Sequence, residues 1–155
     1  MPDTEDLVQD GPYGGPGGKA YDARGKRVVN LQTWRANYNN YDVLGAIEFG
    51  FEDGTSSGRI GGGDPSVNYY PDQPFSFQSG EVIKSMTFYA GDNEGYCDGF
   101  KFDTNLNHHF EGGNTEIGKP NPVSALGNGE WAGATGRDGS HGADAVVDNM
   151  ILSSY

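Results

Sequence analysis

The chain lacks what disulfide frameworks, membrane spans and nucleic-acid surfaces require. Its 155 residues include one cysteine, Cys97, so neither an internal disulfide nor a cysteine-based zinc site can form. No apolar run approaches the ~18 residues that cross a bilayer. The 10 basic residues stand against 22 acidic ones, and the formal charge of −12 repels phosphate backbones and anionic surfaces. We therefore expect neither a nucleic-acid partner nor a membrane-embedded chain.

Sequence signals for catalysis and for export are also scarce. The chain has no metalloprotease histidine pair and no phosphate-binding loop. Glycosidase chemistry needs two carboxylates across a cleft, for which a short chain of small strands has little room. The start, MPDTEDLVQD, has neither the basic region nor the apolar core of a signal peptide, which leaves the localisation open. We expect a protein that is not an enzyme and needs no cofactor.

Glycine and aromatic residues are abundant and indicate an all-β fold. The chain has 26 Gly, 8 Pro, 9 Tyr and 8 Phe, a composition that suits short strands joined by tight turns. Ile47, Phe49 and Phe51 alternate with polar or small residues, which places one face of a strand in a core. Segments 28–33, 82–89 and 131–135 are also predicted strands. Residues 145–152 fit a strand or one face of a short helix.

An internal repeat predicts three similar units. Phe51 and Phe102 each precede a glycine pair by ten positions, and a polar loop closed by an aspartate lies upstream of each. A third such loop, 136–144, precedes the last predicted strand, while the matching glycine pairs stand near the N-terminus. If the two termini are neighbours, the three units close into a body with pseudo-threefold symmetry.

Several segments resemble jacalin-related lectins. Residues 14–22 resemble the glycine loop of that family, 100–105 its F-x-T-N strand and turn, and 131–139 its late G-F-x-G-R-x-G segment, while Asp144 stands where the family has its sugar-loop aspartate. The resemblance implies a β-prism I fold of three four-stranded antiparallel Greek-key sheets. It also implies one lectin domain over residues 11–155, after a flexible acidic tail over 1–10.

The resemblance implies a primary sugar site at the loop that ends in Asp144. A carboxylate accepts hydrogen bonds from adjacent sugar hydroxyls, glycine-rich turns donate main-chain N–H groups, and an aromatic ring covers the C–H face. Four residues separate Gly139 from Asp144 where the family usually has three. The expected primary residues are Gly17, Gly18, Tyr96, Ser140, His141, Gly142 and Asp144.

Pseudo-symmetry adds two further candidate sugar sites. The second comprises Tyr41, Asp42, Gly61, Gly62 and Gly63, and the third Asp98, Gly112 and Gly113. Because the glycine loop lies inside an unbroken chain, the resemblance favours mannose or glucose over galactose. The expected partners are glycans or glycoproteins, with a homo-oligomer possible. The alternatives are a glycan-targeting module of a larger toxin or enzyme, and a structural β-protein without a ligand.

Each candidate also has a purely structural interpretation. Single glycine pairs are ordinarily turns, and single loop aspartates commonly cap their own backbone. His108 and His109 with Glu111 suggest a metal, but adjacent residues of a strand point to opposite faces, so we expect a hairpin turn there. Trp131 is expected in the core.

Overall fold

The chain folds into antiparallel sheets around one core. A computed structural model describes residues 7–14, 19–38, 41–90, 97–116, 118–138 and 146–155, and these residues form 13 strands and no helix. In the described part of the chain, therefore, no helix is long and apolar enough to cross a membrane. The strands are β1 (Val8–Gly14), β2 (Lys19–Arg24), β3 (Val28–Tyr38), β4 (Tyr41–Phe51), β5 (Ile60–Gly61), β6 (Tyr69–Pro71), β7 (Phe75–Ser76), β8 (Ile83–Ala90), β9 (Cys97–Thr104), β10 (His109–Gly113), β11 (Lys119–Pro122), β12 (Trp131–Asp138) and β13 (Val147–Ser154).

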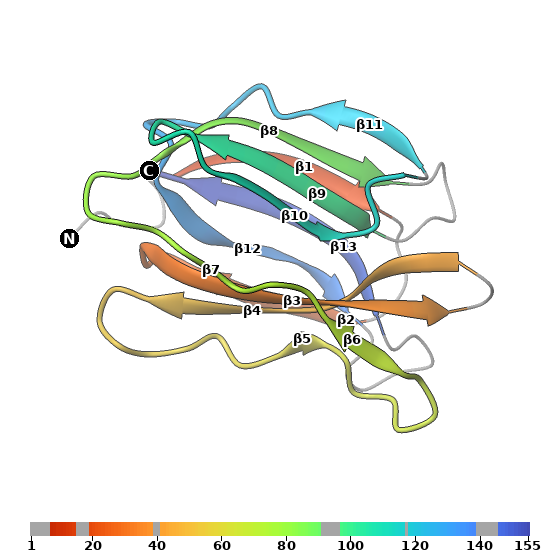
Figure 1. Cartoon of the computed structure of the whole chain (residues 1–155). Coiled ribbons are helices and arrows are strands. Elements are labelled where there is room, and N and C mark those ends of the chain that lie inside the picture. The colour runs from red at the N-terminus through yellow and green to blue at the C-terminus, as the bar shows by residue number, and fades with distance from the viewer. Residues whose placement is uncertain (1–6, 15–18, 39–40, 91–96, 117, 139–145) are drawn as a thin grey trace.

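Three sheets share one topology. Their orders are β1-β13-β12-β2 for the first sheet, β5-β4-β3-β6 for the second and β10-β9-β8-β11 for the third. Each has a central antiparallel pair, β12–β13, β3–β4 or β8–β9, flanked by two outer strands. The ends of β3, β8 and β12 lie at the same end of the molecule, on the right in Figure 1. The predicted prism of Greek-key sheets is confirmed.

The second sheet departs from four strands because its last strand is split. Both β6 and β7 pair with β3, and residues 72–74 leave the ladder between them. Pro74 has no N–H to donate. The carboxylate of Asp72 instead accepts hydrogen bonds from Thr33 and Gly113. The break thus coincides with contacts that Asp72 makes to residues distant in the sequence.

Alternating residues of the predicted strands point toward the core or toward the solvent, as the sequence predicts. Phe100 and Phe102 are buried, whereas Asp103 on the same strand is exposed. In the C-terminal stretch Val147, Met150 and Leu152 are buried in β13, which resolves the ambiguity in favour of a strand. Backbone pairing with β1 on one side and β12 on the other therefore determines this segment.

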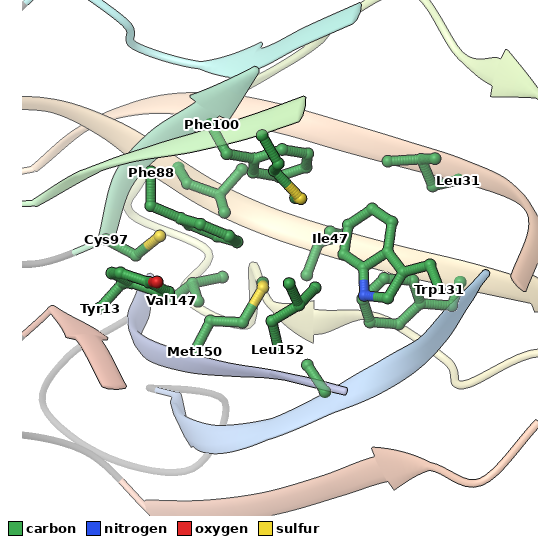
Figure 2. Close-up of a cluster of buried hydrophobic side chains, with 14 of the residues drawn as sticks. Tyr13, Leu31, Ile47, Phe88, Cys97, Phe100, Trp131, Val147, Met150 and Leu152 are labelled. Carbon is green, nitrogen blue, oxygen red and sulfur yellow. The ribbon is translucent and has the colours of Figure 1, made fainter. Parts of the chain in front are cut away.

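The core contains hydrophobic side chains from all three sheets (Figure 2). Trp131 is 2% exposed and lies edge-on to Phe100, with ring centroids 5.6 Å apart. Its indole N–H donates to the carbonyl of Gly133 at 2.9 Å, which satisfies the one polar atom of the ring. Tyr13 stacks on Phe88 at 4.4 Å. Trp131 is thus a core residue, as predicted.

The N-terminal tail predicted over residues 1–10 is too long. β1 begins at Val8, and the carboxylate of Asp10 accepts the N–H groups of Ser124 and Ala125 at 2.8 and 2.9 Å. Burial alone raises the pKa of Asp10, but hydrogen bonds from Ala125, Tyr13 and Ser124 outweigh it and lower the pKa. Asp10 therefore ties β1 to the 124–125 segment. Residues 1–6 lie outside the described residues.

Candidate functional site

Strand register defines three equivalent corners. In each sheet a glycine of an outer strand lies opposite a residue of a central strand. These pairs are Gly14 with Asn149, Gly61 with Ala46, and Gly113 with Gly99. All three outer-strand glycines have positive φ, 123°, 75° and 69°, which favours glycine over any residue with a Cβ. We name the corners first, second and third after their sheets.

The residue that precedes each central-strand partner is an aspartate at two corners. Asp148 takes this position at the first corner and Asp98 at the third, whereas Gly45 takes it at the second. Asp148 is not among the residues expected from sequence, which placed the first-corner carboxylate at Asp144. The signal was present: Val147-Asp148-Asn149-Met150 and Cys97-Asp98-Gly99-Phe100 both read apolar, aspartate, small or polar, apolar.

The expected primary residues cannot be placed in the structure. Gly17, Gly18, Tyr96, Ser140, His141, Gly142 and Asp144 all lie outside the described residues. The main chain beside Asp148 is described, and it is held from two sides. Asn149 lies opposite Gly14 in β1, and its carbonyl accepts the hydroxyl of Tyr21 at 2.9 Å. The backbone position of residue 148 is therefore fixed by both outer strands of the first sheet.

At the third corner the carboxylate is covered. Asp98 is 6% exposed, and burial raises its pKa to about 6. Gly118, at φ 78°, lies so close to the Asp98 carboxylate that a Cβ atom would collide with it. The main-chain carbonyl of Asp98 accepts the N–H of Asn114 at 2.8 Å. The chain after β10 thus covers this aspartate.

The glycine pair of the third corner joins two sheets. The N–H of Gly113 donates to Asp72 Oδ2 at 3.0 Å, and Arg35 donates to the Gly113 carbonyl from Nε and Nη2 at 3.2 and 2.9 Å. Thr33 leaves no room for a Cβ at Gly112 and donates its hydroxyl to Asp72 at 2.8 Å. The polar groups of Gly113 are therefore used within the fold.

At the second corner Asp42 and Gly61 contact other residues than each other. Asp42 is exposed, its carboxylate accepts the side-chain amide of Asn37 at 3.2 Å, and its carbonyl accepts that of Asn114 in the third sheet at 3.2 Å. A Cβ on Gly61 would instead lie 3.3 Å from the main chain of Val146 in the first sheet. Among the described contacts, none joins Asp42 to the 61–63 glycines.

An aromatic ring lies at the second corner, where the third corner has the carboxylate of Asp98. A Cβ on Gly45 would lie 2.9 Å from the ring of Tyr69 and 2.6 Å from the Cβ of Ala36. Gly62 lies against Arg59, Gly63 is exposed, and the side chain of Tyr41 is outside the description. This corner therefore lacks an aspartate at position 45 and has no room for one.

The two histidines have separate partners, as their adjacency predicts. His108 Nδ1 lies 2.7 Å from Glu81, whereas His109 lies between Asp103 at 2.8 Å and Glu111 at 2.7 Å. Within the described ranges, no three His, Cys, Asp or Glu side chains form a group suited to a metal ion. Nδ1 and Nε2 of His109 are both bound to carboxylates.

One short sequence matches the spacing of a hydrolase nucleophile. Gly54-Thr55-Ser56-Ser57-Gly58 has the G-x-S-x-G pattern, but it lies in the turn between β4 and β5 instead of a strand-to-helix elbow. Its central hydroxyl, from Ser56, donates to Glu48 at 2.7 Å. The context is therefore that of a hairpin and not of a nucleophile activated by a histidine.

Three Greek-key sheets with a glycine-lined corner at one end of each define a β-prism. A model of the jacalin-like lectin domain matches residues 10–146, so the chain belongs to this family of carbohydrate-binding lectins. No curated protein sequence gives a match.

Solved structures agree on the fold. AcmJRL, a mannose-binding jacalin-related lectin from Ananas comosus, has a TM-score of 0.70 at 23% identity, over 95% of this chain and 96% of that one. Frutapin, a lectin from Artocarpus incisa, has a TM-score of 0.75 at 19% identity, over 96% and 97%. The lamprey immune protein has a TM-score of 0.72 at 22% identity over 96% of this chain, which spans 44% of that longer chain.

Proposed function

We propose that this lectin domain is non-catalytic and binds glycans of the mannose or glucose type at its first corner. The observation that carries the proposal is the register of β13, which places Asp148 where Asp98 lies at the third corner. An aspartate at this backbone position has a carboxylate, the acceptor that adjacent sugar hydroxyls need. The bond from Tyr21 to the Asn149 carbonyl keeps that position in place.

Two aspartates, Asp144 and Asp148, are candidates for the role of acceptor. Asp144 remains a candidate from the resemblance, together with Gly17, Gly18, Tyr96, Ser140, His141 and Gly142. Asp148 is supported by the register of its strand. We assign the acceptor to Asp148, and we assign to the neighbouring loop residues the main-chain donors and the wall of the site.

We propose one principal site per chain. Asp98 is covered by Gly118, Gly113 is bound by Asp72 and Arg35, and Gly45 faces the Tyr69 ring. These contacts count against the second and third sites expected from pseudo-symmetry. Binding to clustered glycans would then depend on more than one chain.

The choice of mannose or glucose rests on two points. The 15–18 segment connects β1 to β2 within a continuous chain, as the resemblance requires for the mannose/glucose branch. AcmJRL, of the same fold, is described as mannose-binding. A targeting module within a larger protein is the second candidate, favoured by the lamprey immune protein, of which the chain spans less than half.

A glycan array at neutral pH tests the proposal. We expect signals on mannose- or glucose-terminated glycans, unchanged by a chelator. Signals confined to galactose would refute the sugar assignment, and loss of signals with chelator would require a metal. Binding to no glycan would leave the chain a structural β-protein.

A further inference from the structure

A polar groove lies on the outer face of the second sheet. It has a volume of about 500 Å³ and lies over β3, β4 and β7 and the 54–56 turn. Its lining includes the side chains of Asn30, Gln32, Glu48, Ser56, Phe75 and Ser76. The nearest corner is the second, at Gly61 and Ala46, and Ala46 is four residues from Gly50, about 13 Å along an extended strand.

The outer strands of this sheet are short, since β5 and β7 have 2 residues each and β6 has 3. At the groove Gly50 of β4 pairs with Asn30 on one side and with Ser56 on the other. Gly50 lies so close to the side-chain amide of Asn30 that a Cβ would collide with it. The amide therefore lies across β4 at this point, in a gap that a larger residue would close.

Polar groups are aligned across the groove by strand register. Ser76, Asn30, Gly50 and Ser56 form one row from β7 to the turn after β4. In the next outward-facing row Gln32 lies opposite Glu48. Hydroxyls, amides and one carboxylate therefore face the same space.

Two of these polar side chains are held in place. Gln32 Nε2 donates to the carbonyls of Thr33 and Asp72 at 2.8 and 2.7 Å, which leaves its Oε1 as the acceptor of the amide. Glu48 Oε2 accepts the hydroxyl of Ser56 at 2.7 Å. Fixed acceptors lose little conformational entropy when a ligand binds.

We propose that this groove binds a neutral oligosaccharide, as a site separate from the first corner. Amides, hydroxyls and a carboxylate match adjacent sugar hydroxyls. Glu48 and the formal charge of −12 disfavour an anion. A peptide strand is disfavoured because β3 and β4 are paired on both sides here.

Side-chain amide signals in NMR spectra test the proposal directly. We would titrate the isotope-labelled protein, and its Asp148→Asn variant, with mannotriose, maltotriose and cellotriose. The Asn30 and Gln32 amide signals should shift with at least one sugar in both proteins. If no sugar moves these signals, the proposal is wrong, whatever happens at the first corner.

Two charge-removing variants distinguish contact from indirect effects. Glu48→Gln should weaken the binding seen at Asn30 about tenfold, since a hydrogen bond to a charged group is lost. Glu52→Gln, at an exposed site just past β4, is the matched control and should leave it unchanged. Ser76→Ala gives a second test if Glu48→Gln does not fold. Unchanged binding in both groove variants would overturn the proposal.

Discussion

Gly118 lies directly against the carboxylate of Asp98, with no room for a side chain between them. Gly118→Ala should therefore force the 118 segment or Asp98 to move. The left-handed backbone at Gly118, φ 78°, adds its own cost. We expect a loss of about 2–3 kcal/mol in the free energy of unfolding, measured by urea denaturation.

Gly54→Ala separates the collision from the backbone cost. Gly54 has a similar φ of 85°, but nothing lies within 4 Å of its added Cβ. This variant should lose about 1 kcal/mol, the cost of the backbone alone. Equal losses of unfolding free energy in Gly118→Ala and Gly54→Ala would mean that a Cβ at position 118 does not collide with Asp98.

Asp98 should make the protein less stable as pH rises through the acid range. Its folded pKa of about 6 lies above the ordinary value of 3.8, so between these values the folded state holds a proton that the unfolded state has lost. The stability difference, on the order of 3 kcal/mol, should develop between about pH 4 and pH 6 and then stay constant.

The Asp98→Asn variant isolates this effect from other titrating groups. Relative to wild type, it should gain stability as pH rises from 4 to 6, because it has no carboxylate to ionise in a buried place. Urea denaturation of both proteins at several pH values gives the difference. A difference that does not vary with pH would contradict the burial of an ionisable Asp98.

His109 should titrate above its ordinary pKa of 6.5. Hydrogen bonds to Glu111 and then Asp103 favour the charged imidazolium and raise the pKa. Its stabilising contribution is present at low pH and is lost as pH rises through the raised pKa. NMR titration of the imidazole signals should show a lower pKa in Glu111→Gln than in wild type. An unchanged midpoint would mean that the Glu111 contact does not form in solution.

Much of the fold could be predicted from the sequence because burial alternates along the strands. Ile47, Phe49 and Phe51 point inward as expected, and Trp131 lies in the core. The C-terminal stretch was ambiguous only because strand and helix patterns overlap in a short apolar segment. The split of the fourth strand in the second sheet depends on the contacts of Asp72, which no local pattern reveals.

The sites were harder to predict because pairing in the sheets decides which residues meet. The sequence repeat matched Phe51 with Phe102, whereas the register at the corners makes Phe49 the equivalent of Phe102. This offset from Phe51 to Phe49 changes which residue lies at a corner. It separates Asp42 from the position of Asp98, and it makes the backbone of residue 148 in β13 the equivalent of residue 98.

Calorimetric titration of mannotriose into wild type and three matched variants tests the central claim most directly. Wild type should bind one sugar per first corner, and Asp148→Asn should abolish that binding. Asp144→Asn should still bind mannotriose, because it keeps the charged acceptor of Asp148. Asp42→Asn should also still bind it, because the first corner stays intact. The contrary result is an Asp148→Asn protein, folded by circular dichroism, that binds mannotriose at the first corner as tightly as wild type.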